Sequence, residues 1–293
     1  MTRYGLLSYH NLNLGDEIQS LAARQFLPHV DQYVNRDSLK DVSESLMVIL
    51  NGWWMHRSEG GRSWREKRGP YVWPPDANIT PVLVSMHVAE EAKAVMASEE
   101  SLRYLRRHGP VGCRDEATRT FFKSHNVPAY FSGCLTLTFP RNEPTSRKGM
   151  LFVDVPSRRI PDCPAFVRSA ATKVVHSSRE PDILKRLELA EERLAMYQRA
   201  ELVVTSRLHC AIPCLALGTP VKIVGDVAKD ARWSGMVEWF PKWSFDGSDW
   251  QLNKWRSHEN RLMAVRERLV TACHERLGIV AKDTQEKTVV TRT

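Results

Sequence analysis

The stretch that most constrains the fold of this chain runs from residue 200 to residue 224 and reads AELVVTSRLHCAIPCLALGTPVKIV. The apolar run LVV at residues 202–204 is typical of a buried parallel strand. Apolar residues then recur at helical spacing, at Leu208, Ile212, Leu215 and Ala216. Gly218 and Pro220 end this helix, and residues 221–224 predict the next strand. The stretch therefore predicts a strand–helix–strand unit of a parallel sheet.

Basic residues stand at the start of the predicted helix. Ser206 offers a hydroxyl as N-cap, and Arg207 and His209 lie in the first turn. Ligands of parallel sheets collect at the carboxyl ends of the strands, where a helix N-terminus presents free N–H groups. Cations there oppose the helix dipole unless an anion neutralises them. We therefore expect an anion pocket; the alternative is a solvated Arg207 and a core histidine.

The composition favours a globular protein with a small anionic ligand. The 293 residues suffice for two domains, and the net charge of +8 fits phosphates, nucleic acid or an anionic membrane surface. The basic residues are dispersed among acids without zinc-finger spacing, which argues against specific nucleic-acid binding. Peripheral contact with the inner membrane face stays open. No membrane-span-length apolar run or signal peptide is visible, so we expect a cytoplasmic protein.

The six cysteines form no CxxC pair and no framework spacing, which predicts reduced core thiols. Cys210 and Cys214 lie four residues apart on one predicted helix, but the further ligands that zinc needs are lacking. We expect no metal and no cofactor.

Alternating strands and helices predict an α/β fold with two Rossmann-like lobes facing a cleft. Residues 1–140 form the first lobe, the polar segment 141–148 is a linker, and residues 149–250 form the second lobe. Strands are expected at residues 3–9, 46–50, 82–86, 111–113, 129–131, 150–155 and 172–176. An amphipathic helix lies within residues 251–278, with Leu262, Val265, Leu269, Cys273 and Leu277 on one face. We expect the polar tail at residues 279–293 to be disordered.

The first lobe carries a second group of candidate ligand-binding residues. Asn11, Gly15 and Asp16 lie where the first strand gives way to a helix, with Asp16 able to cap it. Asn51 and Gly52 follow the strand at residues 46–50, and a glycine there allows a ligand or another backbone to approach closely.

A long loop at residues 53–75 combines Trp with Arg, Lys, Gly and Pro. It begins with Trp53 and Trp54 and contains Trp64 and Trp73. Aromatic faces beside cations suit a sugar that carries phosphate, because the ring stacks while the cations hold the anion. An aromatic mini-core is the alternative.

Two further basic residues occupy positions like that of Arg207. Arg114 stands between the strand at residues 111–113 and a helix, as a ligand-binding residue or as a partner of Asp115 or Glu116. Lys229 follows the strand at residues 221–224.

The motifs resemble those of the polysaccharide pyruvyl transferase family, whose members resemble GT-B glycosyltransferases in having two Rossmann-like lobes. The matching pieces are NLGDEIQSLA, the strand ending in NGWW, VGCRDEAT and, most specifically, SRLHCAIPCLALGTPV. The resemblance implies transfer of the enolpyruvyl unit of phosphoenolpyruvate onto a sugar of a polysaccharide or its precursor, with a pyruvate ketal and phosphate as products. It places the family's basic residues at Arg114, Arg207, His209 and Lys229.

These assignments define two expected subsites. The donor is expected at Arg114, Ser206, Arg207, His209 and Lys229, with Arg114, Arg207 and His209 as catalytic residues. A nucleotide-linked, lipid-linked or oligosaccharide acceptor is expected at Asn11, Gly15, Asp16, Asn51, Gly52, Trp53 and Trp54. The cationic helix start should depress the pKa of His209, and bound phosphate should raise it. Two alternatives stay open: a GT-B glycosyltransferase that uses a nucleotide sugar, and a non-catalytic protein that binds anionic glycan.

Overall fold

The computed structural model describes residues 2–39, 42–54, 73–141, 144, 146–225, 227–241, 244, 250 and 259–278. Before the predicted linker, its elements are β1 (Tyr4–Ser8), α1 (Leu14–Arg24), β2 (Gln32–Asn35), β3 (Leu46–Ile49), β4 (Gly52–Trp54), β5 (Ile79–Val82), β6 (Met86–Val88), the 3-10 helix η1 (Glu90–Ala92), α2 (Lys93–Met96), α3 (Glu99–His108), β7 (Val111–Cys113), α4 (Glu116–Ser124), β8 (Ala129–Phe131) and η2 (Leu135–Thr138).

The elements after the linker are β9 (Met150–Val153), η3 (Ser157–Asp162), α5 (Ala165–Ala170), β10 (Ala171–Val174), α6 (Ile183–Arg199), β11 (Leu202–Thr205), α7 (Leu208–Ala216), β12 (Val221–Ile223), η4 (Val227–Lys229), η5 (Ala231–Trp233), η6 (Val237–Trp239) and α8 (Glu259–Leu277).

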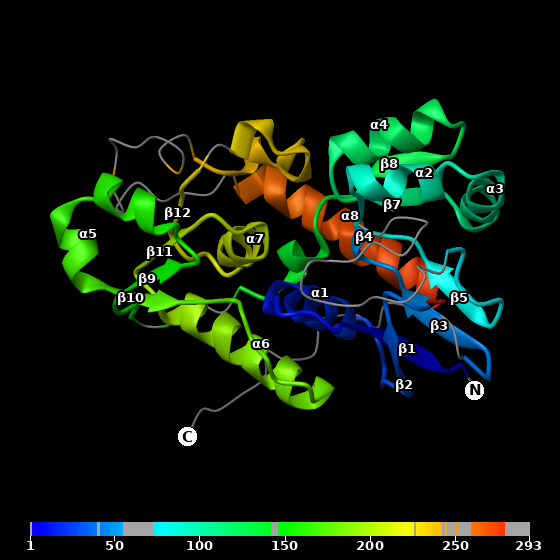
Figure 1. Ribbon diagram of the computed structural model, residues 1–293, viewed down its shortest axis with the longest axis horizontal. Coiled ribbons are helices and arrows are strands. Elements are labelled where there is room, and N and C mark those ends of the chain that lie inside the picture. Colours follow the sequence, from blue (N-terminus) through cyan, green and yellow to red (C-terminus); the bar gives the residue numbers. More distant parts are fainter. Residues whose placement is uncertain are drawn as a thin grey trace, which may run out of the picture.

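The strands form three four-stranded sheets, and every recorded pairing between strands is parallel. The strand orders are β2-β1-β3-β5, β4-β6-β7-β8 and β10-β9-β11-β12. Figure 1 shows the third sheet at one end of the molecule and the other two at the opposite end. The α/β class is therefore confirmed, and a Rossmann-like arrangement is consistent with it, although the first half contains two sheets instead of one.

The two sheets of the first half follow one another along the same strands, because β3 leads into β4 and β5 into β6. The breaks occur at residues with positive φ, +118° at Gly52 and +58° at Ser85. The Ser85 hydroxyl donates to the carbonyl of Gly133 at 2.8 Å and accepts from the N–H of Leu135 at 2.7 Å. The single strand predicted at residues 82–86 was therefore wrong, since this left-handed residue ends β5 before β6 begins.

The strand–helix–strand unit predicted at residues 200–224 is present as β11, α7 and β12. All four residues of β11 are buried. Two predicted helix caps were wrong. Arg207, with extended backbone angles, is the N-cap residue of α7, while the Ser206 hydroxyl donates to the carbonyl of Asp154 at 3.0 Å. Asn13 caps α1 by accepting from the N–H of Gly15, which leaves Asp16 inside the first turn.

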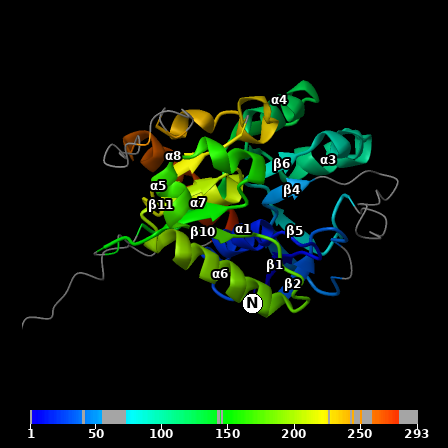
Figure 2. The ribbon, with the colours of Figure 1, turned by 60° about the vertical axis from the view of Figure 1, so that its left-hand side comes forward.

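One hydrophobic core joins the two halves of the chain. It includes Ile18 of α1, Leu135 of η2, Leu187 of α6 and Ile212 of α7. Figure 2 shows α1 and α7 in the middle of the molecule and α6 along its lower edge. In α8, Leu262, Val265, Leu269, Cys273 and Leu277 are buried in the same core. The division into lobes at residues 1–140 and 149–250 stays a prediction, because this core contains residues from both sides of the proposed boundary.

The six cysteines are buried and unpaired, as the sequence predicts. Burial raises the pKa of Cys273 to about 12, so this thiol is not ionised near neutral pH. Among the helices in the described part of the chain, none has the length and hydropathy needed to span a bilayer. The tail at residues 279–293 lies outside the described residues.

Candidate active site

Arg114 and His209, which lie 95 residues apart in the sequence, are in direct contact. The guanidinium Nη1 of Arg114 lies 3.2 Å from Nε2 of His209. Arg114 follows β7 in the first half, and His209 belongs to the first turn of α7 in the second. The side chains are enclosed, with relative exposures of 1% for Arg114 and 9% for His209. The predicted meeting of basic residues from both halves is confirmed for this pair.

The contact fixes the protonation state of His209 in the resting protein. Because Arg114 can only donate, Nε2 of His209 accepts, and the ring proton of the neutral imidazole resides on Nδ1. Burial lowers the pKa of His209 well below its ordinary value, and the charges of Arg114 and Arg232 lower it further. The expected depression is thus confirmed in direction, but burial is its largest cause and the helix start is not.

The start of α7 adds backbone N–H groups to the site. No side chain caps this helix. Its first helical hydrogen bonds run from the N–H groups of Cys210 and Ala211 to the carbonyl of Arg207. The preceding N–H groups, of Leu208 and His209, therefore lie at the positive end of the helix dipole. The backbone departs from helical angles at His209, with φ −80° and ψ 19°, which kinks the helix where the site lies.

Arg114 has donors without acceptors. Its Nε and Nη2 atoms are buried and make no hydrogen bond. Nη1 donates to Oε1 of Gln19 at 3.4 Å, and the carboxylate of Asp115 lies 3.7 Å from Nε. A buried guanidinium with unsatisfied N–H groups is costly, and burial lowers the pKa of Arg114. An anionic ligand with several oxygens would satisfy these donors.

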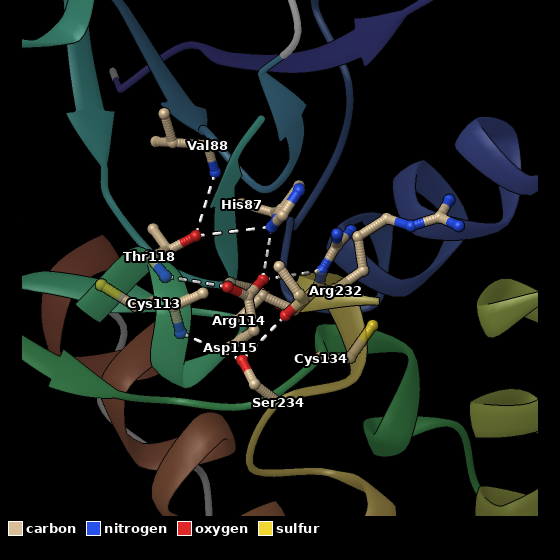
Figure 3. A network of polar contacts seen from close by, with 12 residues as sticks. His87, Val88, Cys113, Arg114, Asp115, Thr118, Cys134, Arg232 and Ser234 are labelled. Carbon is tan, nitrogen blue, oxygen red and sulfur yellow. Dashed lines mark hydrogen bonds and ion pairs between the residues drawn. The ribbon is translucent and has the colours of Figure 1, made fainter. Parts of the chain in front are cut away.

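Asp115 organises the buried network beside Arg114, which Figure 3 shows from close by. Its carboxylate accepts from Nδ1 of His87 at 2.6 Å and caps α4 by accepting from the N–H of Thr118 at 2.9 Å. The hydrogen bond from His87 lowers the pKa of Asp115, whereas burial opposes this. The residue is thus an ionised anchor for His87, Arg114 and the first turn of α4.

The start of α4 is closed to ligands by Ser234. Its carbonyl accepts from the N–H of Glu116 at 3.1 Å, and its hydroxyl accepts from the N–H of Ala117 at 3.0 Å. The starts of α4 and α7 therefore differ, since Ser234 occupies the first N–H groups of α4 and no side chain caps α7.

Arg207 has another partner. Its Nε donates to Oδ2 of Asp154 at 2.9 Å, and its side chain is 51% exposed. Its charge contributes to lowering the pKa of His176, which falls to about 4 chiefly through burial. Lys229 is exposed on η4. The donor-binding roles of Ser206, Arg207 and Lys229 stay predictions.

Several predicted acceptor residues form a polar chain that reaches Arg114. Asp16 accepts from Nδ2 of Asn11 at 2.7 Å and from Nε2 of Gln19 at 3.1 Å. Gln19 in turn accepts from Arg114, and Asn51 holds its backbone by donating to its carbonyl at 2.9 Å. Gly52 lies beside the same side chain, since a Cβ there would be 3.7 Å from Oε1 of Gln19. This part of the first half therefore adjoins the Arg114–His209 contact.

Three predicted acceptor residues have other surroundings. Gly15 is buried, and a Cβ there would lie 3.1 Å from Oδ1 of Asn13. Trp54 is fully buried, with its ring centroid 5.0 Å from that of Trp73, so its ring has no free face and the mini-core alternative holds for this pair. Trp53 is half-buried near His87, at 6.3 Å between ring centroids. Residues 55–72 of the predicted loop lie outside the described residues.

Sequence reasoning missed four polar residues around this site: Gln19, Asp154, His176 and Arg232. Asp154 and His176 stand at or just beyond the carboxyl ends of β9 and β10, so the rule applied to Arg207 could have found them. Gln19 lies inside a helix and Arg232 in a short 3-10 helix, and neither carries a local signal.

A pocket of about 1080 Å³ lies elsewhere, between α8 and the elements β8 and η6. Tyr130, Phe131 and Arg268 line it, together with Glu116 and Gly235, which are neighbours of Asp115 and Ser234. Arg114 and His209 are not among its lining residues. In the residues that the structure describes, no group of three or more acids, histidines or cysteines is arranged to hold a metal ion.

Parallel sheets with flanking helices, and a buried basic contact at the carboxyl ends of β7 and β11, define an α/β protein with a basic site where such sheets place their ligands. Residues 96–224 match the model of the family described as polysaccharide pyruvyl transferase. The resemblance found in the motifs is thereby confirmed. At the level of the family, the match implies polysaccharide pyruvyl transferase activity. Arg114, Arg207 and His209 all fall within the matched residues.

Among solved structures, that of a functionally uncharacterised protein from Klebsiella pneumoniae subsp. pneumoniae is similar to this chain. The TM-score is 0.46 and the sequence identity 13%, over 79% of this chain and 87% of that one. No curated protein matches the sequence significantly.

Proposed function

We propose that this protein transfers the enolpyruvyl unit of phosphoenolpyruvate onto a sugar of a polysaccharide or its precursor, in a cleft between two lobes resembling those of GT-B glycosyltransferases. The observation that carries the proposal is the buried contact between Arg114 and His209, in which two guanidinium nitrogens have no acceptor. Phosphoenolpyruvate offers a carboxylate and a phosphate, and Arg binds both groups well because its planar donors match their oxygens.

Donor binding changes the state of His209 in this mechanism. In the resting protein the neutral imidazole cannot serve as an acid, because its Nε2 lone pair accepts from Arg114. A bound phosphate offsets the positive charge of Arg114, which raises the pKa of His209 and favours its protonated form. The acid therefore forms only when its substrate is present.

The reaction balances without a redox partner. A proton adds to the methylene carbon, the hydroxyl of the acceptor attacks the resulting oxocarbenium-like carbon, and the C–O bond to phosphate breaks. A second sugar hydroxyl then closes the ketal. The two sugar hydroxyls lose their protons when they add to this carbon. One of these protons balances the proton that the methylene carbon gained, and the other leaves with phosphate. His209 supplies the proton to the methylene carbon or to the departing phosphate.

The proposal predicts that His209→Ala and His209→Gln both abolish phosphate release from phosphoenolpyruvate in the presence of a panel of sugar acceptors. General acid catalysis typically contributes about 10²–10⁴-fold, so the loss should be at least of that order. The matched control is His29→Gln, because His29 is 55% exposed on its side chain and lies outside the site. Near-normal phosphate release by a folded His209 variant rejects the role.

A further inference from the structure

Arg232 lies near Arg114 and His209 on a segment that is hydrogen-bonded to the start of α4 (Figure 3). Arg232 belongs to η5, and Ser234, two residues further on, makes the two hydrogen bonds that close the start of α4. A segment of the second half is thereby tied to the first half next to Arg114. Figure 3 shows Arg232 beside the network of Arg114, Asp115 and His87.

The surroundings of Arg232 combine cations with an aromatic ring. Its guanidinium carbon lies 5.2 Å from the centroid of the Trp53 ring, an arrangement that favours a fixed orientation of the planar group. Its charge contributes to lowering the pKa of His209, Arg114 and His87, in accord with its closeness to all three. Arg232 therefore adds a second guanidinium to a site that already holds Arg114.

Asp230 currently occupies the donors of Arg232. Its two carboxylate oxygens each lie 2.9 Å from Nε of Arg232, and Oδ2 also accepts from Nη2 at 2.5 Å. The side chains are 37% and 26% exposed, so the pair is partly solvated and contributes little to stability. Such a pair can exchange one anionic partner for another at small cost, whereas Arg114 is buried and has unsatisfied donors.

We propose that Arg232 is a donor-binding residue that leaves Asp230 and binds the phosphate group of the substrate opposite Arg114, while stacked on Trp53. This inference rests on the proposed function, because it takes a phosphorylated donor as the ligand. It assigns the second cation of the site to Arg232, since the charge of Arg232 acts on both Arg114 and His209, whereas that of Arg207 acts on His176. Asp230 acts as a competitor that the incoming phosphate displaces.

Substitutions of Arg232 and of Asp230 should have opposite effects on binding of the donor. Substitutions of the two partners of a purely structural ion pair should not. Arg232→Gln should weaken binding of phosphoenolpyruvate at least tenfold, because charge-assisted hydrogen bonds to phosphate are lost. Asp230→Asn should tighten binding several-fold, because the competing carboxylate is gone. Both are measured by titration calorimetry on the full chain. The control pair is Arg159→Gln and Asp162→Asn, an exposed ion pair of η3 at 3.3 Å, which should leave binding unchanged.

Parallel titrations with inorganic phosphate separate this inference from the proposed function. Arg232-dependent binding of phosphate without binding of phosphoenolpyruvate supports the anion site and rejects the donor. Unchanged binding of phosphoenolpyruvate by both variants, or equal weakening in both, overturns the role of Arg232 and leaves the donor assignment intact. Failure of the wild-type chain to bind either anion overturns both.

Discussion

His87, His176 and His209 are buried histidines whose pKa values all lie below the ordinary value of 6.5, with burial as the largest cause in each. The fold therefore favours the neutral imidazole at all three positions. For His209 this is the resting state of the proposed acid. For His176, the hydroxyl of Tyr197 makes a hydrogen bond with Nε2, and the side chain is 1% exposed.

The depressed values predict that the protein loses stability as the pH falls. Each histidine's contribution is present above the unfolded pKa of about 6.5 and is lost as the pH falls towards the folded value, about 4 for His176. For His176 the shift corresponds to roughly 3 kcal/mol at most. Glu17 acts in the opposite direction, because burial raises its pKa to about 7 and so favours its neutral form.

Urea unfolding of the wild type and of His176→Gln, from pH 7 to pH 4, tests this prediction. The free energy of unfolding of the wild type should fall over this range, and that of the variant should fall less steeply. The slope with pH is the informative quantity, because the variant also changes the contact with Tyr197. Parallel curves for the two proteins would contradict the assignment.

At the residue scale, sequence reasoning found the residues whose position follows from a local rule. Arg114 and His209 each stand next to the carboxyl end of a strand, which is where the parallel-sheet rule places ligands. Arg232 was missed because its position depends on hydrogen bonds between Ser234 and the start of α4, more than 110 residues earlier in the chain. Trp54 was expected to bind the acceptor, because Trp73, the residue that its ring packs against, lies near the other end of the predicted loop.

Helices α4 and α6 begin in the same way but in different environments. Asp115 accepts from the N–H of Thr118, and Asp182 accepts from the N–H of Lys185, each at 2.9 Å. Asp182 is exposed and acts as a cap only. Asp115 is fully buried and also pairs with His87 and Arg114. A comparison of the two helix starts therefore separates the contribution of an N-cap to stability from the contribution of a buried charge.

Substituting each aspartate by asparagine keeps the cap and removes the charge. Asn caps helices about as well as Asp, so Asp182→Asn should change the free energy of unfolding by less than about 0.5 kcal/mol. Asp115→Asn should lower it by roughly 3–5 kcal/mol, because Arg114 is left as a buried charge without its carboxylate. Urea titration of the two variants decides the point. Similar small losses in both would show that Asp115 is a cap only.

At the scale of elements, the apolar patterns predicted β11, α7 and β12 to within two residues at each end. They failed where backbone geometry depends on distant partners. The single strand at residues 82–86 was broken by Ser85, whose left-handed backbone is stabilised by bonds to Gly133 and Leu135. The predicted cap at Ser206 was wrong because that hydroxyl bonds to Asp154, which follows a strand about fifty residues earlier.

At the scale of the whole molecule, the two halves are joined by more than the linker. α1 and α6 pack together in the shared core, and Glu17 of α1 accepts a buried hydrogen bond from Nε of Arg186 of α6 at 2.6 Å. α8 contacts the first half again, where Arg266 donates to the carbonyl of Thr138. Such contacts keep the segment that carries Arg114 next to the segment that carries His209. Sequence patterns indicate which faces are apolar but not which distant face each one meets.

A crystal structure of the full chain with phosphoenolpyruvate tests the central claim most directly, since that claim concerns where a phosphorylated anion binds. The account predicts the ligand between the two halves, with its oxygens within hydrogen-bonding distance of Arg114, Arg232 and Nε2 of His209, and with Arg232 released from Asp230. A ligand bound instead in the pocket between α8 and β8, with the Arg114–His209 contact unchanged, would contradict it.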